Sequence, residues 1–246
     1  MSAAIDWEAQ LARRLNRATP DAAVREVLHY AVLPAGKLFR PRLLEALATD
    51  LHADMEEILP WGCALELHHA YSLVHDDLPC MDNDLVRRGK PSTHVQFGQW
   101  RALLAGDALL ALSYATLEEL THMQAPLLRK LFHWATGAQG LILGQWIDLA
   151  GGAPDPARLM RMHELKTARL MQLACAGAFV LADVDGLKAP LRLGASIGLA
   201  FQLLDDLDDI SSPEHAPHED EVNPFLLAPE AALARLRRAR APAIIA

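Results

Sequence analysis

Two runs of aspartate, each directly after an apolar stretch, are the part of this sequence best suited to chemistry. One runs from Asp76 to Asp82 and the other from Asp205 to Asp209. Carboxylates at the end of an apolar helix are costly unless a cation binds there. Oxygen ligands of this kind suit Mg²⁺, which commonly takes one or two carboxylates together with substrate phosphates. We therefore predict two carboxylate clusters that bind magnesium.

The spacing inside each run agrees with a metal site. Asp205 and Asp209 are four residues apart and share one face of a helix. Asp76 and Asp82 would not share a face of a straight helix, and Pro79 predicts a break that bends Asp82 back toward the same site. One isolated acidic run is about as often a solvated helix end. Two runs on separate apolar helices make that interpretation much weaker.

Phosphate substrates also need positive side chains, and the sequence supplies them. Lys37 offers a point charge, and Arg40 has a guanidinium that can form a forked contact with phosphate. The pair Arg87-Arg88 follows the first aspartate run. Taken alone, Lys37 and Arg40 would fit a solvated loop, and the arginine pair would fit salt bridges to Asp82 or Asp84. Their occurrence close to the aspartates favours phosphate binding.

Composition limits the fold and the partners. Among 246 residues, 52% are hydrophobic but only 6% are aromatic, and a core of mostly Leu and Ala favours helices packed on helices. The net charge of -8 argues against a nucleic-acid partner, since nucleic acids attract basic surfaces. Scattered cysteines indicate a reducing compartment. The N-terminus lacks a signal-peptide pattern, and the longest apolar stretch, Leu173–Ala182, is too short for a membrane span, so we expect a cytoplasmic protein.

Helical periodicity dominates the chain, with no convincing run of alternating strand residues. Two segments depart from it. Residues 78–97 are polar and contain proline and glycine, which indicates a functional loop, and residues 211–224 have the composition of a mobile segment. Apolar helices flank both segments closely, so we predict one all-α domain over 1–246. The predicted helices cover Ile5–Arg17, Asp21–Tyr30, Pro41–Asp50, Met55–Asp77, Gly98–Leu120, Pro126–Leu149, Asp155–Ala182, Pro190–Ile210 and Pro229–Arg240.

Both aspartate runs lie in longer motifs. The first motif reads His69-Ala-Tyr-Ser-Leu-Val-His-Asp76-Asp77-Leu-Pro-Cys-Met-Asp82-Asn-Asp-Leu-Val-Arg87-Arg88-Gly89-Lys-Pro91, and the second reads Phe201-Gln202-Leu-Leu-Asp205-Asp206-Leu-Asp-Asp209. They closely resemble the two aspartate-rich motifs of bacterial farnesyl-type prenyl diphosphate synthases, short-chain trans-prenyltransferases of the polyprenyl synthetase family. The resemblance extends from about Pro34 to Asp209. It implies a single-domain helical bundle of the isoprenoid synthase type with a central active-site cavity.

The resemblance implies substrates and metal ligands. The family's ligands for isopentenyl diphosphate match Lys37, Arg40, His69 and Arg88, and its ligand for the allylic diphosphate matches Arg87. Magnesium, with three ions expected when substrate is bound, would be held by Asp76, Asp82, Asp205 and Asp209. The resemblance also implies a reaction in three steps. The allylic diphosphate ionises, the double bond of isopentenyl diphosphate attacks the resulting cation, and a proton is lost to the released diphosphate. His75, beside the aspartates, is then expected to be structural.

A third group resembles the residues that flank the allylic carbon in the family. Lys166, Thr167 and Gln202 match these positions and would offer carbonyl or hydroxyl dipoles to the allylic cation. From the residues alone, Lys166 would also fit an exposed helix face, and Gln202 a polar contact in the core. Asp148 is expected to support the site without binding metal.

The implied function is condensation of isopentenyl diphosphate with a short allylic diphosphate by a homodimer, to give farnesyl or geranyl diphosphate. Two alternatives stay open. A terpene cyclase-like lyase ionises one diphosphate, and the segment Gly36–Pro41 and Arg88 would then have no role. A weakly active or non-catalytic paralogue would pair with an active subunit, but both aspartate motifs retain their metal-binding positions.

Tyr71, five residues before Asp76, bears on product length. A growing prenyl chain is expected to follow the helix that carries Asp76, and Tyr71 lies roughly 7–8 Å along that helix. The family uses this position to set chain length, so Tyr71 is the predicted floor, with farnesyl diphosphate as product and geranyl diphosphate as runner-up. Tyr71 would also fit an ordinary core position, and His68 is then the next candidate for the floor.

The segment after the second motif lacks a feature that the family usually has. Family members carry lysines in Gly-Lys pairs that close over the allylic diphosphate, whereas residues 210–224 contain no lysine and include Glu219-Asp220-Glu221. The region after residue 210 is also shorter than the family pattern. Loss of a charge-assisted contact to phosphate costs about 1.5–3 kcal/mol. We therefore predict weaker binding of the allylic substrate.

Overall fold

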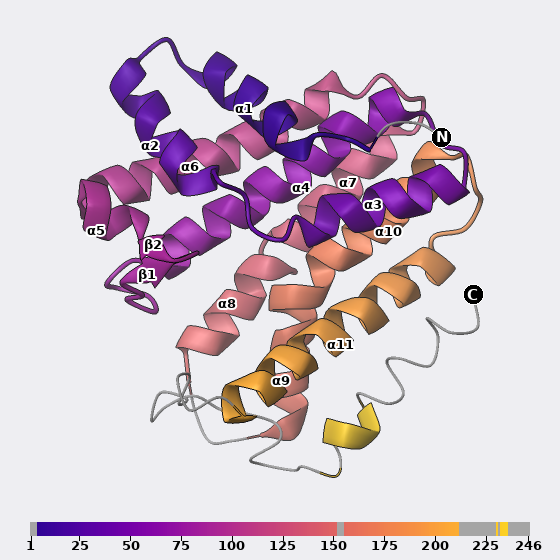
Figure 1. Cartoon of the computed structure of the whole chain (residues 1–246). Coiled ribbons are helices and arrows are strands. Elements are labelled where there is room, and N and C mark those ends of the chain that lie inside the picture. The colour runs from indigo at the N-terminus through magenta and orange to yellow at the C-terminus, as the bar shows by residue number, and fades with distance from the viewer. Residues whose placement is uncertain (1–3, 152–154, 212–229, 231, 236–246) are drawn as a thin grey trace. The chain divides into compact units, whose positions relative to one another are not determined.

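The computed structural model describes residues 4–151, 155–211, 230 and 232–235, without the side chains at 205 and 208–211. In this part of the chain the elements are helices, apart from one two-stranded hairpin (Figure 1). The predicted all-α class is confirmed. Contacts divide the chain into unit 1, Met1–Pro126 with Gly177–Val184, and unit 2, Leu127–Ala176 with Asp185–Ala246. A single domain over 1–246 stays a prediction, because such a division does not show whether the units fold independently.

Unit 1 is organised around α4. Its elements are α1 (Trp7–Ala18), α2 (Ala22–Val32), α3 (Phe39–Asp50), α4 (Met55–Asp76), β1 (Val86–Arg87), β2 (Lys90–Pro91), α5 (Thr93–Phe97), α6 (Gln99–Thr116) and the 3-10 helix η1 (Leu117–Glu119). The side chain of Asp54 starts α4 by accepting the N–H of Glu56 at 3.0 Å, as N-cap residues do. The helix packs along α6 and α3 (Figure 1) and is buried over most of its length. It is therefore a rigid support for the residues at its C-terminal end.

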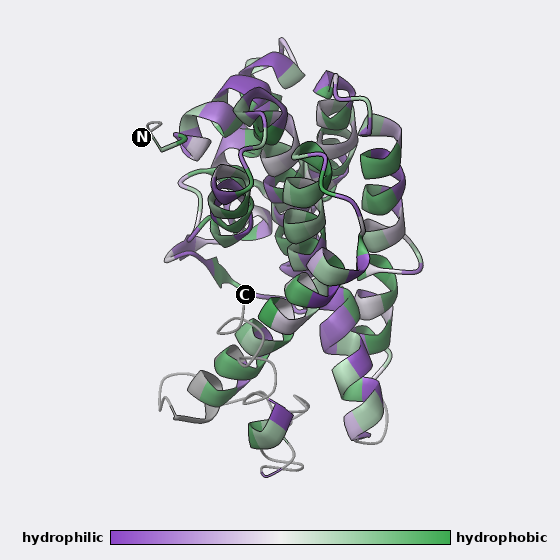
Figure 2. Cartoon of the chain, turned by 90° about the vertical axis from the view of Figure 1, so that its right-hand side faces the viewer, coloured by the Kyte–Doolittle hydropathy of each residue, from purple (hydrophilic) through white to green (hydrophobic). Residues whose placement is uncertain are grey.

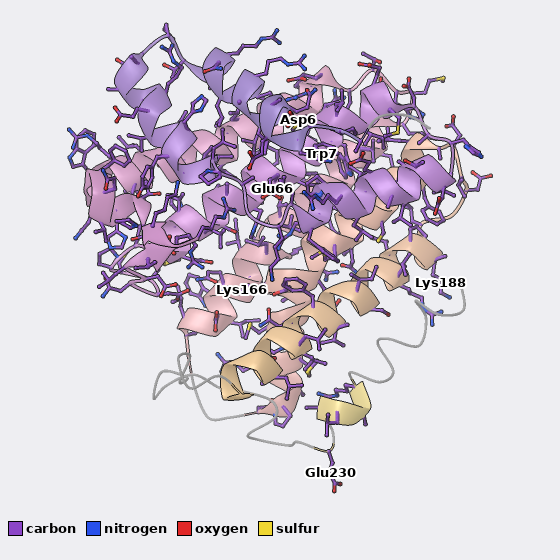
Figure 3. All side chains as sticks on the ribbon, in the orientation of Figure 1. Asp6, Trp7, Glu66, Lys166, Lys188 and Glu230 are labelled. Atoms are coloured by element: carbon purple, nitrogen blue, oxygen red, sulfur yellow. The ribbon has the colours of Figure 1, made fainter. Side chains whose placement is uncertain are left out.

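The first helix is anchored on the same core by one tryptophan. Trp7, labelled in Figure 3 at the start of α1, is 3% exposed. Its ring packs on Gly62 of α4, where a Cβ atom would collide with it. Its Nε1 donates to Glu45 of α3 at 2.8 Å. One side chain therefore joins three helices.

Unit 2 is organised around a π-helical turn. It contains most of α7 (Ala125–Thr136), α8 (Leu141–Leu149), α9 (Pro156–His163), the π turn η2 (Glu164–Ala168), the first part of α10 (Arg169–Leu181), and α11 (Lys188–Ser211). Helices α8, α9 and α11 all contact η2. A Cβ at Gly144 would lie 2.5 Å from the backbone nitrogen of Lys166, and one at Gly198 would lie 2.5 Å from Cα of Ala168. Glycine thus permits the close approach of α8 and α11 to the π turn, a feature frequent at functional sites.

Two sequence predictions of secondary structure are wrong. The helix predicted over 126–149 is two helices, because the chain turns at Gly137–Gly140 and a Cβ at Gly140 would collide with the carbonyl oxygen of Ala135. The segment 78–97 contains the hairpin and α5 in addition to loop. Arg88 and Gly89 have φ of +54° and +73°, as a tight two-residue hairpin turn requires. Alternation could not reveal these strands, because each has only two residues.

The amphipathic character of the helices is visible in Figure 2, where polar and apolar residues lie side by side along single helices. Such helices pack their apolar face inside. Within the described ranges, no helix combines the length and apolarity needed to cross a bilayer. Of the helix predicted over 229–240, residues 230 and 232–235 are described and helical, and the segment from 212 to 229 lies outside the described residues.

Candidate active site

The chain reverses direction directly after α4. The backbone N–H of Asp82 donates to the carbonyl of Asp76 at 2.9 Å, and that of Asn83 donates to the carbonyl of Leu78 at 3.1 Å. The bend expected from Pro79 is therefore present, and it places Asp82 beside Asp76. Asp76 is half-buried and Asp82 is exposed. This turn can present both carboxylates to a cation from solvent.

Arg87 is held by two carboxylates. Its Nε and Nη2 donate to Oδ1 of Asp77 at 2.9 and 2.5 Å, and Nη2 donates to Asp84 at 2.6 Å. The side chain of Asp77 is 2% exposed, and burial raises its pKa while the hydrogen bonds and charge of Arg87 oppose that rise. The salt bridge to Asp84 left open above is therefore present, together with one to Asp77. Among the described residues, Nη1 of Arg87 makes no hydrogen bond.

The hairpin is fastened to the chain segment after α2. Nη1 of Arg88 donates to the carbonyl oxygens of Val32 at 3.0 Å and Pro34 at 3.4 Å. Nζ of Lys90 donates to two more carbonyls of this region at 2.6 and 2.7 Å. The guanidinium of Arg88 also packs on Gly36, where a Cβ would lie 3.2 Å from Nε. Two basic motifs that lie far apart in the chain thus meet.

Arg40, His69 and Arg88 form one electrostatic group. Burial lowers the pKa of His69 well below its usual value, and the positive charges of Arg40 and Arg88 lower it further. The imidazole is therefore neutral near pH 7 and can donate one N–H, while the arginines supply charge. Lys37, three residues before Arg40, is exposed. The structure brings together three of the side chains predicted to bind isopentenyl diphosphate, whereas Lys37 makes no hydrogen bond or ion pair with them among the described residues.

Glu66 belongs to this group although the motifs do not reveal it. It lies on α4 one turn before His69 (Figure 3) and is 3% exposed. Its Oε1 is 3.9 Å from Nη2 of Arg88. Burial raises the pKa of Glu66, and the charges of Arg40 and Arg88 oppose that rise. A sequence signal exists, because Glu66 is the sole charged residue of the apolar run 58–67.

Tyr71 lies in an aromatic cluster between α4 and α6. It is 7% exposed, and its ring meets that of His68 edge-on at 4.7 Å and that of His75 at 5.3 Å between centroids. His68 in turn meets Tyr114 of α6 at 6.0 Å. Burial raises the pKa of Tyr71 to about 12, with the charge of Asp76 adding to the rise. Tyr114 is a neighbour of the predicted floor that sequence spacing on α4 could not reveal.

Lys166 lies in the π turn of unit 2 (Figure 3). Its Nζ donates to Oδ2 of Asp148 on α8 at 2.6 Å. The two side chains are 26% and 35% exposed. The interpretation of Lys166 as a merely exposed residue is therefore wrong, and Asp148 supports a predicted site residue, as expected. The ammonium charge is balanced by this carboxylate.

Thr167 and Gln202 are joined in a hydrogen-bonded chain. Oγ1 of Thr167 donates to Oε1 of Gln202 at 2.7 Å, and Nε2 of Gln202 donates to Oδ1 of Asp206 at 3.0 Å. Oδ2 of Asp206 lies 3.8 Å from Nδ1 of His163. Burial lowers the pKa of His163 to about 4, while Asp148 raises it and Lys166 lowers it. The imidazole is therefore neutral near pH 7.

Of the four predicted magnesium ligands, the structure describes the side chains of Asp76 and Asp82. The side chains of Asp205 and Asp209 lie outside the described ones. Within the described part of the chain, no group of three histidine, cysteine or acidic side chains is close enough to hold a metal ion. The turn at Asp76 and Asp82 nonetheless provides carboxylate oxygens, which fit Mg²⁺ when phosphate oxygens and water complete the coordination.

These features define an all-helical protein of the isoprenoid synthase type, and comparison with solved structures agrees. The fold is similar to a geranyltranstransferase from Thermotoga maritima, with a TM-score of 0.84, 30% identity, and coverage of 95% of this chain and 85% of that chain. It is also similar to a geranyltransferase from Legionella pneumophila, with a TM-score of 0.82, 33% identity, and coverage of 95% and 83%.

The chain belongs to the polyprenyl synthetase family, whose model matches residues 21–219. It is 36% identical over 217 residues to a farnesyl diphosphate synthase of Geobacillus stearothermophilus, in a match that covers 84% of this chain and 73% of that one. It is 35% identical over 210 residues to the small subunit of a heterodimeric geranylgeranyl pyrophosphate synthase of Arabidopsis thaliana, in a match that covers 81% of this chain but 64% of that one. The predicted family and the enzyme class, trans-prenyltransferase, are confirmed.

Proposed function

We propose that this chain is a magnesium-dependent enzyme that condenses isopentenyl diphosphate with a short allylic diphosphate. The observation that carries the proposal is the group formed by Arg40, His69 and Arg88 around Glu66 in unit 1. It offers two guanidinium groups and a neutral imidazole to an anion, in addition to the carboxylate motif. A terpene cyclase-like lyase has one diphosphate substrate and would leave this group without a role.

Asp76 and Asp82 would hold magnesium in unit 1, and Asp205 and Asp209 are the proposed ligands in unit 2. Exposed carboxylates on a turn fit Mg²⁺, because this ion retains water and shares its coordination with substrate phosphates. When bound, magnesium supplies a Lewis acid that stabilises the charge of a leaving diphosphate. Three ions in the substrate complex stay part of the proposal.

The proposed reaction breaks the allylic C–O bond, forms a carbon–carbon bond with the alkene of isopentenyl diphosphate, and transfers one proton to the released diphosphate. We propose that Nη1 of Arg87 binds the allylic diphosphate. Oγ1 of Thr167 donates its hydrogen to Gln202, so its lone pairs are oriented for a cation. Lys166 opposes a cation less than an isolated ammonium would, because Asp148 balances its charge.

The product and the oligomeric state are further parts of the proposal. We propose farnesyl diphosphate as product, with geranyl diphosphate as the shorter alternative, because Tyr71 and the rings behind it form a bulky wall five residues before Asp76. We also propose a homodimer. Helix α6 supports it by exposing Trp100 at 61%, Leu103 at 46% and Leu104 at 56%, an apolar surface of the kind that interfaces cover. A cytoplasmic location stays a prediction from composition.

A second candidate function has one specific observation in its favour. A relative of this chain at 35% identity is named the small subunit of a heterodimeric synthase. The chain would then act as a partner of a catalytic subunit, and the lysine-free segment 210–224 would reflect that role. The segment lies mostly outside the described residues, so the argument rests on its sequence.

One assay separates these functions. The purified chain is incubated with Mg²⁺ and geranyl diphosphate, first alone and then with isopentenyl diphosphate, while diphosphate release and product length are measured. The proposal expects diphosphate release and a farnesyl product only when both substrates are present. Release with geranyl diphosphate alone would indicate a lyase. Absence of turnover with both substrates would favour the partner-subunit function.

A further inference from the structure

Asp206 differs in its surroundings from a carboxylate that is open to a metal ion. Its side chain is 10% exposed and lies near His163, the last residue of α9. Oδ1 accepts the hydrogen bond from Gln202 at 3.0 Å, and Oδ2 lies 3.8 Å from His163. Both oxygens therefore face protein groups. The residue stands in the second aspartate motif but points into unit 2.

The bond to Asp206 decides how the amide of Gln202 is oriented. An ionised carboxylate only accepts hydrogen bonds, so the NH₂ end of the amide must face it. The oxygen end then faces Thr167 and accepts its hydroxyl hydrogen at 2.7 Å. Because a hydroxyl has one hydrogen, both lone pairs of Thr167 Oγ1 are left for a positive partner. With the amide reversed, Thr167 would accept from Nε2 and would direct its hydrogen outward, toward an anion.

We infer that Asp206 is a positioning residue that sets the polarity of the Thr167–Gln202 pair, so that the pair favours an allylic cation over a phosphate. The inference rests on the proposed condensation, in which such a cation forms. Asp206 acts through Gln202 and does not touch the substrate. A direct role as metal ligand is the competing explanation, because Asp206 follows a predicted ligand in the sequence.

An exchange of donor and acceptor separates these explanations. In Gln202→Glu two carboxylates face each other, and the hydrogen-bonded chain breaks. In Gln202→Glu/Asp206→Asn the new amide at position 206 donates to the new carboxylate at position 202. The direction of donation between these two positions is therefore reversed. The carboxylate at position 202 still accepts the hydroxyl hydrogen of Thr167. Net charge equals that of the native chain. The matched control is Gln202→Glu/Asp208→Asn, which restores the same net charge without the new donor at position 206.

The turnover number is measured for all variants with geranyl diphosphate, isopentenyl diphosphate and Mg²⁺. We expect Gln202→Glu to lose about 30-fold or more, since removing one preorganised group at a developing charge costs about two to three orders of magnitude at most. We expect the turnover number of Gln202→Glu/Asp206→Asn to be at least three times that of the control Gln202→Glu/Asp208→Asn. A ratio below three overturns the inference, because a metal ligand or a simple charge effect predicts no such rescue.

Thermal midpoints of the same variants test the hydrogen-bonded geometry without turnover. If Gln202→Glu does not fold, the comparison uses Asp206→Leu in the native and the Gln202→Leu backgrounds. The inference is supported if Asp206→Leu lowers the turnover number by threefold or less in the Gln202→Leu background and by more than that in the native background. Any other pattern overturns positioning through Gln202. A native chain without product refutes the proposed function, whereas an active native chain without rescue refutes this inference alone.

Discussion

The two units of this chain handle charge in different ways. In unit 1, two guanidinium groups, those of Arg40 and Arg88, lie close enough to the buried carboxylate of Glu66 to oppose the rise of its pKa. In unit 2, Nζ of Lys166 donates to the carboxylate of Asp148 at 2.6 Å. The described polar groups near this pair include the hydroxyl of Thr167, the amide of Gln202, the carboxylate of Asp206 and the neutral imidazole of His163. This difference supports the proposal that unit 1 holds diphosphates and that the π-turn region of unit 2 tolerates a carbocation, which an unbalanced ammonium would repel.

This contrast connects the geometry with the proposed chemistry. An enzyme that ionises one diphosphate next to a second must attract anions at one place and tolerate a cation at another. Charge compensation decides which residues can do which task, since a paired cation attracts phosphate less than an unpaired one. The expected effects of breaking this arrangement follow, from the largest to the smallest.

The carboxylate turn of unit 1 is expected to have the largest effect. Asp76→Ala or Asp82→Ala should lower turnover by about 100-fold or more, because the group that stabilises the leaving diphosphate is lost. Exposed Asp50→Ala, on α3, serves as the control and should leave turnover unchanged. EDTA should abolish activity, and added Mg²⁺ should restore it. Turnover that survives chelation would show that the metal assignment is wrong.

The buried histidines of the two units are expected to make stability depend on pH. Burial lowers the pKa of His68 to about 3 and of His163 to about 4, against about 6.5 in an unfolded chain. Between these values the unfolded chain binds a proton that the folded chain does not, so stability present above about pH 6.5 is lost as pH falls. For His163, the shift corresponds to roughly 3 kcal/mol at about 1.4 kcal/mol per pKa unit.

Urea unfolding at several pH values measures this effect. We expect His163→Gln to flatten the stability profile between about pH 4 and 6.5, and His68→Gln to flatten it further down, to about pH 3. His133 is exposed on α7, and His133→Gln is the control that should keep the native profile. An unchanged slope in both buried-histidine variants would contradict their neutral state.

The two ion-paired carboxylates sharpen the comparison between units. Glu66→Gln removes the buried charge opposite Arg40 and Arg88 and should lower the free energy of unfolding by about 1–3 kcal/mol. It should also raise the Michaelis constant for isopentenyl diphosphate, by about tenfold if one charge-assisted contact is misplaced. Asp148→Asn breaks a partly exposed pair and should cost less than about 1 kcal/mol, with its main effect on turnover. If Asp148→Asn lowered the free energy of unfolding more than Glu66→Gln does, the expected order of the two ion pairs would be wrong.

The aromatic wall beside α6 is expected to affect product length more than rate. Tyr71→Ala should shift products toward longer chains, because the ring that stops the prenyl tail is removed. Tyr114→Ala should add a smaller shift when combined with it, since Tyr114 lies behind His68. Tyr71→Phe retains the ring and is the matched control. Chromatography of the products after dephosphorylation measures the effect, and an unchanged distribution in Tyr71→Ala would place the floor elsewhere.

The lysine-free segment after the second motif is expected to have the smallest effect. Asp220→Lys should lower the Michaelis constant for the allylic substrate by about threefold at low salt, less than a full charge-assisted contact because solvent and salt screen the charge. Asp220→Asn removes only the repulsion and should have a weaker effect. If neither variant changes the constant, the missing lysine has no consequence in this chain.

Local sequence patterns were sufficient to predict those structural features that depend on residues close together in the chain. Pro79 predicts the reversal after α4 because a proline cannot continue a helix, and the backbone bond from Asp82 to Asp76 follows from it. The helices themselves follow from apolar periodicity. The break at Gly140 was missed, because the requirement for glycine there comes from the close approach of the Ala135 carbonyl, which depends on the local path of the backbone.

Sequence by itself determined the family, the helical class and the residue types available for phosphate and metal. The tertiary structure decided which charges far apart in the chain compensate one another. Lys166 and Asp148 are 18 residues apart, Thr167 and Gln202 are 35 apart, and Arg88 lies on a carbonyl 56 residues earlier in the chain. Coulomb and hydrogen-bond energies depend on distances of a few ångströms in space, and separation along the chain does not specify such distances. For that reason the surroundings of Glu66 and Asp206 are set only in the folded protein.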